Sequence, residues 1–168
     1  MGQTSNMFPE TDHQDLYKQA KLKAVDLLAR REQSRFELKS KLARNSEFSE
    51  DLIEAVLEEM MTLGYQSDAR FTEVFIRHRA NSGYGPLRIS RELYGKGIPQ
   101  GLFRDVSEQE AVDFFEIAAK LYARKFSPDI IKDYKSYQKS FRYMANRGFS
   151  SEHIQHAKDL LLSSCEGQ

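Results

Sequence analysis

Residues 82–98 have the sequence SGYGPLRISRELYGKGI, and this stretch indicates most clearly how the chain folds. Gly83 and Gly85 interrupt the helical pattern that precedes them, and Pro86 suits the first position of a new helix. Apolar residues then recur at helical spacing until Gly97 closes the segment. The stretch therefore predicts a tight turn that leads into a short helix.

The same pattern recurs along the chain at an interval of 51 residues. Leu42, Leu93 and Met144 are separated by this interval, and each is followed by a joint in which an apolar residue precedes a helix-starting residue. The apolar residues of these joints are Phe48, Ile98 and Phe149. No alternating pattern typical of strands competes with the helical one. We therefore predict an all-α fold of three tandem three-helix repeats of about 50 residues, stacked into an elongated, curved array.

The helix signals also give expected boundaries. We expect a flexible N-terminal tail over 1–14, followed by repeats over 15–64, 65–107 and 108–168. In the first repeat, capping serines at Ser34 and Ser49 predict the starts of the second and third helices. In the last repeat we expect one long helix over 108–126, a segment that ends at Gly148, and a final helix over 150–162.

Composition excludes several classes of protein. The chain of 168 residues is 40% hydrophobic and 30% charged with a net charge of zero, so it is not a globally basic nucleic-acid protein. Its single cysteine, Cys165, allows neither a disulfide framework nor a CxxC pair. No signal peptide and no long apolar run are present. We expect a soluble, cytoplasmic monomer that does not associate with a membrane.

Charge is distributed unevenly. Residues 46–64 contain six acids and no base, which predicts a solvated acidic helix face, whereas residues 65–106 contain seven bases and four acids. Arg88 and Arg91 are three residues apart and share a helix face. The positions 51 residues later hold a second basic pair, Lys139 and Arg142, whereas the first repeat has Glu37 and Ser40 instead. These pairs favour an extended anionic partner, and the alternative that they are merely solvated residues stays open.

No motif indicates catalysis. His153 and His156 could share a metal ion, but no third ligand is evident, so we predict no metal site. His78 lies on an apolar stripe with Phe71, Val74 and Phe75, which predicts a partly buried core residue rather than a general base. The GYGP turn is too short to bind a phosphate, and its proline lacks an N–H donor. We expect no cofactor and no enzymatic activity.

Three stretches carry a resemblance to a known family. GYQSDARFTEVFIRHRANSGYGPLRISRELYGKGI at 64–98 resembles the central signature of the RecX proteins, supported by LLARREQSRFELKSKL at 27–42 and NRGFSSEHI at 146–154. The resemblance covers about residues 16–162. It implies a non-enzymatic modulator of the recombinase RecA in DNA repair, recombination and the SOS response. Such a protein would lie in the groove of the RecA filament on single-stranded DNA and inhibit its ATPase, strand-exchange and coprotease activities.

The resemblance also implies which residues contact the partner. The matching positions in the signature are Arg70, Arg77, Arg79, Tyr84, Arg88, Arg91 and Lys96, and the repeat adds Lys139 and Arg142. Which of them contact RecA and which contact DNA is open at this point. Gln66 replaces an apolar residue common in the family, and the zero net charge predicts only weak direct DNA binding. The alternative is a stand-alone helical DNA-binding protein that acts without RecA.

Overall fold

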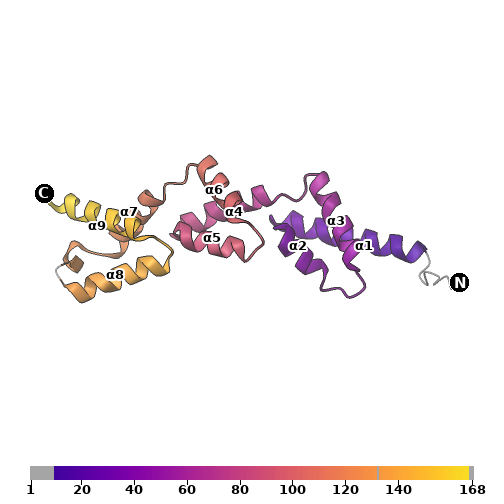
Figure 1. The fold of residues 1–168 in the computed structure, drawn as a ribbon, viewed down its shortest axis with the longest axis horizontal. Coiled ribbons are helices and arrows are strands. Elements are labelled where there is room, and N and C mark those ends of the chain that lie inside the picture. The colour runs from indigo at the N-terminus through magenta and orange to yellow at the C-terminus, as the bar shows by residue number, and fades with distance from the viewer. Residues whose placement is uncertain (1–9, 132, 167–168) are drawn as a thin grey trace. The chain divides into compact units, whose positions relative to one another are not determined.

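The computed structural model describes residues 10–131 and 133–166, and within them it contains nine α-helices, one 3₁₀ helix and no β-strand (Figure 1). The helices are α1 (Glu10–Arg30), α2 (Arg35–Leu42), α3 (Glu50–Thr62), α4 (Asp68–Asn81), α5 (Pro86–Tyr94), α6 (Gln100–Gln109), α7 (Phe114–Lys125), α8 (Tyr134–Asn146) and α9 (Ser151–Glu166), with the 3₁₀ helix at Pro128–Ile131. The predicted all-α class is confirmed. Contacts divide the chain into two compact units, 1–71 and 72–168, so the boundary falls within α4. The predicted boundaries at 64/65 and 107/108 stay predictions.

The first unit is a three-helix cluster in which α1, α2 and α3 pack against one another. Its core consists of Ala20, Ala24, Leu38, Leu42, Phe48, Leu52, Ile53, Val56, Leu57 and Met60. The serines predicted to cap helices do so, because Ser34 Oγ accepts from Glu37 N at 3.1 Å and Ser49 Oγ accepts from Leu52 N at 3.3 Å. Each cap satisfies a backbone donor at a helix start that has no partner within the helix.

The acidic face of α3 is matched by basic residues on the helices beside it. Arg35 Nη2 lies 2.6 Å from Glu54 Oε2 and 2.9 Å from Glu58 Oε1. Lys39 Nζ lies 2.6 Å from Glu54 Oε1. Lys21 of α1 pairs with Glu59 at 2.6 Å. The hydrogen bond from Lys39 is the main reason why the pKa of Glu54 is lowered. The acids of α3 thus pair with bases of α1 and of α2 around the hydrophobic core of the first unit.

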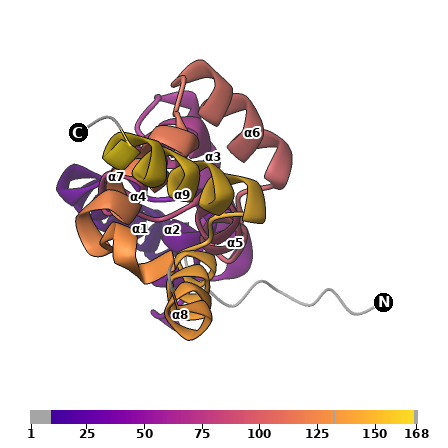
Figure 2. The same cartoon turned by 90° about the vertical axis from the view of Figure 1, so that its left-hand side faces the viewer.

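The second unit contains the rest of α4 and all of α5 to α9. Within it, α7 and α9 lie side by side and α8 packs on α9 (Figure 2). Their shared core consists of Ala118, Leu121, Tyr122, Met144, Phe149, Ile154 and Ala157. Tyr122 is fully buried, and its hydroxyl lies 2.9 Å from Ser140 Oγ, so this buried polar group has a partner.

The 51-residue interval corresponds to a repeated local structure. Leu42, Leu93 and Met144 are fully buried. The apolar joint residues Phe48, Ile98 and Phe149 are buried as well. The joints after α5 and α8 close with the same backbone bond, from Ile98 N to Leu93 O at 3.1 Å and from Phe149 N to Met144 O at 3.2 Å. The glycine before each bond, Gly97 or Gly148, has a φ of 80° or 90°, a region that favours glycine.

Two predicted helix boundaries are wrong. Helix α1 begins at Glu10 rather than near Asp15, which is consistent with acidic residues near a helix start; the rest of the predicted tail, 1–9, lies outside the described residues. The helix predicted over 108–126 begins later, at Phe114, because the short helix α6 before it extends to Gln109. Ala111 adopts a φ of 48°, and Asp113 caps α7 by accepting from Glu116 N at 2.9 Å.

The predicted burial of His78 is also wrong. His78 is exposed and Val74 is 49% exposed, whereas Phe71, Thr72 and Ile76 are buried. The buried face of α4 is therefore centred about one residue, or roughly 100°, away from the predicted stripe. A buried threonine hid this shift, because hydrophobic periodicity does not count it.

Candidate functional site

Tyr84, in the turn before α5, lies among three guanidinium groups. The guanidinium carbons of Arg79 and Arg88 are each 4.5 Å from its ring centroid, and that of Arg147 is 4.9 Å away. Arg79 comes from α4, Arg88 from α5 and Arg147 from the end of α8. These distances are within the range of cation–π attraction, so one aromatic ring joins three helices.

One carboxylate serves two of these arginines. Glu92 Oε2 accepts from Arg79 Nε at 2.6 Å, and Glu92 Oε1 accepts from Arg88 Nε at 3.0 Å. Burial alone would raise the pKa of Glu92, but the hydrogen bonds from Arg79 and Arg88 outweigh it and lower this pKa below its ordinary value. Glu92 is therefore ionised and fixes both arginines beside Tyr84.

The other contacts of Arg88 and Arg147 fasten two helix ends to each other. Arg147 Nη1 donates to Ser82 O, just after α4, at 2.9 Å, and Arg88 Nη1 donates to Asn146 O, at the end of α8, at 3.2 Å. Carbonyls at a helix end lack partners within the helix and carry partial negative charge, so both contacts are favourable. Each arginine thus caps a helix of the other repeat.

The backbone makes the same joint. Gly85 N donates to Arg147 O at 2.8 Å, and Leu87 N donates to Gly148 O at 3.1 Å. A Cβ atom at Gly85 would overlap the carbonyl of Gly148, and one at Gly148 would lie 2.9 Å from the Cα of Arg88. Both positions therefore require glycine. The backbones of the second and third repeats are in direct contact at these two residues.

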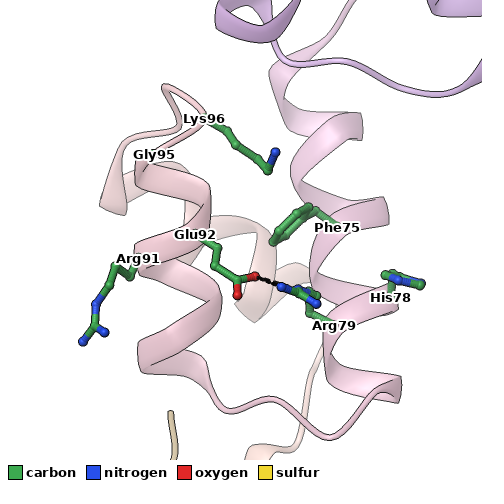
Figure 3. Close-up of a pocket in the computed structure, with 7 residues that line it drawn as sticks. All are labelled: Phe75, His78, Arg79, Arg91, Glu92, Gly95 and Lys96. Atoms are coloured by element: carbon green, nitrogen blue, oxygen red, sulfur yellow. Dashed lines mark hydrogen bonds and ion pairs between the residues drawn. The ribbon is translucent and has the colours of Figure 1, made fainter. Parts of the chain in front are cut away.

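Beside this joint, an open hollow of about 580 Å³ lies between α4 and the end of α5 (Figure 3). It is lined by Phe75, His78, Arg79, Arg91, Glu92, Gly95 and Lys96. Figure 3 shows Glu92 directed at Arg79 inside the hollow, while Arg91 points away from α4. Lys96 Nζ lies 5.7 Å from the ring centroid of Phe75. The hollow has more cationic than anionic groups and could receive a carboxylate or a phosphate.

Two other arginines of the signature, Arg70 and Arg77, are paired with acids. Arg70 binds Glu32 at 3.0 Å and Tyr65 O at 3.0 Å. Arg77 pairs with Glu73 at 2.7 Å and with Glu110 at 2.8 Å, and the hydrogen bond that Arg77 donates to Glu110 is the main reason why the pKa of Arg77 is raised. A partner would have to compete with these carboxylates for either arginine.

The basic pair of the third repeat is placed differently. Lys139 and Arg142 are exposed on α8, and among the described residues neither makes an ion pair or a side-chain hydrogen bond. The structure thus separates the two predicted pairs: Arg88 is part of a joint, whereas Arg91, Lys139 and Arg142 face solvent.

Sequence reasoning missed Glu92 and Arg147. The signal for Arg147 was present, because it lies 51 residues after Lys96, in the equivalent joint. Glu92 could have been found as the acid four residues after Arg88, a spacing that places the two side chains together on a helix.

The described residues contain no group of three or more side chains suited to hold a metal ion. His153 instead packs on Phe115, with ring centroids 4.4 Å apart, and its Nδ1 lies 2.6 Å from Ser150 Oγ. Burial is the main reason why the pKa of His153 is lowered. Over the same described residues, no helix is both long enough and apolar enough to cross a membrane.

The fold and the site define a class of tandem three-helix proteins in which arginines join neighbouring repeats. Three models of one family match the chain in order: the first, second and third three-helix domains of RecX match residues 20–60, 67–106 and 111–157. The chain belongs to the RecX family of regulatory proteins.

Relatives and solved structures agree with this assignment. The chain is 40% identical over 131 residues to regulatory protein RecX of Pseudomonas entomophila (strain L48), an alignment that covers 78% of this chain and 84% of the relative. It is equally similar to that of Legionella pneumophila (strain Corby), with 78% and 87% covered. The crystal structure of RecX from Lactobacillus salivarius superposes with a TM-score of 0.76 at 24% identity, covering 88% of this chain and 97% of that one, which shows the shared fold.

Proposed function

We propose that this protein regulates RecA by binding its filament on single-stranded DNA, in the filament groove, and that it inhibits ATP hydrolysis, strand exchange and coprotease activity without catalysing a reaction itself. The proposal includes action as a monomer in the bacterial cytoplasm. It also includes the three repeat boundaries expected from the sequence, 15–64, 65–107 and 108–168.

The observation that carries the proposal is family membership across all three domains, because the curated relatives are named as regulatory proteins. The surface chemistry supports it. Arg91 and Lys96 border an open hollow, and Lys139 and Arg142 are exposed on α8. A filament of protein and nucleic acid offers both carboxylates and phosphates to such cations.

The joint at Tyr84 supports a simple physical means of inhibition. Because reciprocal arginine contacts and two backbone bonds join the second and third repeats, their exposed cations are held at a fixed separation. A ligand with two fixed contacts in a filament groove would hinder the subunit movements coupled to ATP hydrolysis. It would also obstruct a second duplex.

The test is ATP hydrolysis by RecA on single-stranded DNA, with the protein titrated in. The informative variant is Arg91→Glu, because Arg91 is exposed and makes no ion pair among the described residues. Arg88 is unsuitable because its replacement also disturbs the joint. The matched control is Arg104→Glu on α6, where the arginine side chain is 73% exposed.

We expect the native protein and Arg104→Glu to suppress hydrolysis, and Arg91→Glu to need at least about tenfold more protein for the same effect, as loss of roughly 1.4 kcal/mol would require. If the native protein leaves the RecA rate unchanged at every ratio, the proposed function is wrong. Equal inhibition by all three proteins would instead remove Arg91 from the contact.

A further inference from the structure

We infer that the outward face of α8 is a binding site for single-stranded nucleic acid, with bases stacked on Tyr134 and Phe141 and phosphates bound by Lys135, Lys139 and Arg142. This inference deepens the proposed function, on which it rests in part, by assigning a ligand to one surface of the protein. These five residues are called the α8 face below.

The first observation is charge. The sequence of α8, YKSYQKSFRYMAN, contains three bases and no acid. All three bases are exposed, and among the described residues none forms an ion pair. The nearest acid in the chain, Asp133, is occupied as the helix cap, where it accepts from Ser136 N at 3.1 Å and from Lys135 N at 3.2 Å. The pKa of Asp133 is lowered mainly by the side-chain hydrogen bond from Ser136 and in part by the charge of Lys139. The α8 face therefore carries three cations against one carboxylate at the helix start, and it stays positive.

The second observation is the presence of exposed rings among these bases. Tyr134 is 72% exposed and Phe141 is 36% exposed. The two residues are seven apart, so they lie on the same side of the helix, about 10 Å apart along its axis. By contrast, Ser140 and Met144 on the inward side are fully buried. Phe141 also lies near Tyr137, with ring centroids 6.4 Å apart, so Tyr134 is the more open of the two rings.

Exposed rings beside cations that form no ion pair fit one kind of ligand best. Every nucleobase has a flat face that can stack on an aromatic ring, and a single strand exposes these faces, whereas a duplex keeps its bases stacked and paired. Phosphates spaced along the strand complement the three cations. An acidic protein segment would satisfy the cations but would leave Tyr134 without a specific role.

The middle repeat lacks this combination. In α5, Arg88 is engaged by Glu92 and Asn146, and the nearby Tyr84 is surrounded by guanidinium groups. Neither can bind a strand without disrupting the joint. This difference assigns direct strand contact to α8 and leaves the hollow beside α5 for contact with protein.

The test measures binding of the full-length protein alone to a fluorescein-labelled oligothymidylate of about 16 nucleotides, by fluorescence anisotropy across a salt series. The variants are Tyr134→Ala and the double variant Lys139→Ala/Arg142→Ala. The matched control, Arg104→Ala/Lys120→Ala, removes two positive charges from α6 and α7, where both side chains are 73% exposed. Circular dichroism confirms that each variant is folded.

We expect the double variant to bind more weakly and to reduce the slope of log affinity against log salt by about 1.4, from two lost phosphate contacts. Tyr134→Ala should weaken binding about fivefold or more without changing that slope, since stacking does not release counterions. The control should bind as the native protein does.

Three results would overturn the inference: native-like binding by the double variant, an equal loss in the control, or a Tyr134→Ala affinity identical to that of the native protein. Binding of a labelled polyglutamate peptide in place of the oligonucleotide would also overturn it and identify the α8 face as a protein-docking surface. RecA ATPase assays on the same variants separate the two proposals, because inhibition by the native protein upholds the proposed function even where strand binding fails.

Discussion

Helices α5 and α8 occupy equivalent places in neighbouring repeats, yet their basic residues serve different purposes. Arg88 and Lys139 are 51 residues apart, as are Arg91 and Arg142. The position that holds Glu92 in α5 holds Tyr143 in α8. Glu92 pairs with Arg88, whereas the ring of Tyr143 packs edge-on against Phe126 at 5.6 Å.

One carboxylate therefore decides whether a repeated cation is structural or available. In α5 the carboxylate holds Arg88 against Tyr84, and this position lets Arg88 cap the end of α8. In α8 no carboxylate takes this place, and Lys139 is exposed without an ion pair among the described residues. The pKa of Asp133 at the helix start is lowered mainly by the hydrogen bond from Ser136, although the charge of Lys139 contributes to this shift. A repeated basic pair is consequently a poor guide to function until the acids beside it are known.

The largest effect on stability is expected at Gly148, the glycine at which the end of α8 approaches α5. Replacing Gly148 with alanine should lower the free energy of unfolding by about 3–4 kcal/mol, because the residue has a φ of 90° and its Cβ would lie 2.9 Å from Arg88 Cα. Urea unfolding monitored by circular dichroism measures the loss.

Gly83→Ala is the matched control for this prediction. Gly83 has a similar φ of 74°, but its Cβ would make an ordinary contact at 3.5 Å with Leu121. Gly83→Ala should lower the free energy of unfolding by only about 1–2 kcal/mol, which is the strain of the left-handed conformation. Equal losses for the two variants would show that close approach at the joint contributes nothing.

A variant with a smaller expected effect removes the carboxylate that α5 has and α8 lacks. Glu92→Gln should reduce stability by about 1–2 kcal/mol at neutral pH, since Arg79 and Arg88 lose a charged acceptor. At the same time it should slightly strengthen binding of the oligothymidylate, because the middle repeat loses one negative charge.

The pH dependence of the Glu92→Gln effect follows from the lowered pKa of Glu92. In the folded protein the pKa of Glu92 lies below its ordinary value of 4.5. Its ionised carboxylate therefore stabilises the protein fully above pH 4.5, and this contribution is lost as the pH falls through the folded pKa. The stability difference between native protein and variant should therefore be full at pH 7 and vanish in acid. A difference that grows on acidification would contradict the assigned role of Glu92.

Much of the fold could be predicted from the sequence because it depends on local signals. The 51-residue interval, the serine caps and the buried joint residues are all readable from residue type and spacing. The break between α6 and α7 was placed too early, because Ala111 adopts a left-handed conformation that alanine rarely takes. The face of α4 was misplaced because Thr72 is buried despite being polar.

The candidate site was predicted less well, because it depends on contacts between repeats. The sequence identified Tyr84, Arg79 and Arg88 as notable, but it could not show that all three belong to one joint with Arg147. That arrangement arises only when the end of α8 reaches the start of α5, more than 50 residues away. Likewise, the freedom of Lys139 and Arg142 depends on which acids lie nearby in space.

The most direct test of this account compares two single variants at equivalent positions, Arg88→Ala and Lys139→Ala, for both stability and oligothymidylate binding. The account predicts that Arg88→Ala lowers the free energy of unfolding by about 1–2 kcal/mol, whereas Lys139→Ala changes it by less than about 0.5 kcal/mol. It also predicts that only Lys139→Ala weakens strand binding and lowers its salt dependence. If Lys139→Ala is the destabilising variant, or if both variants lose strand binding equally, the division between a structural and an available cation is wrong.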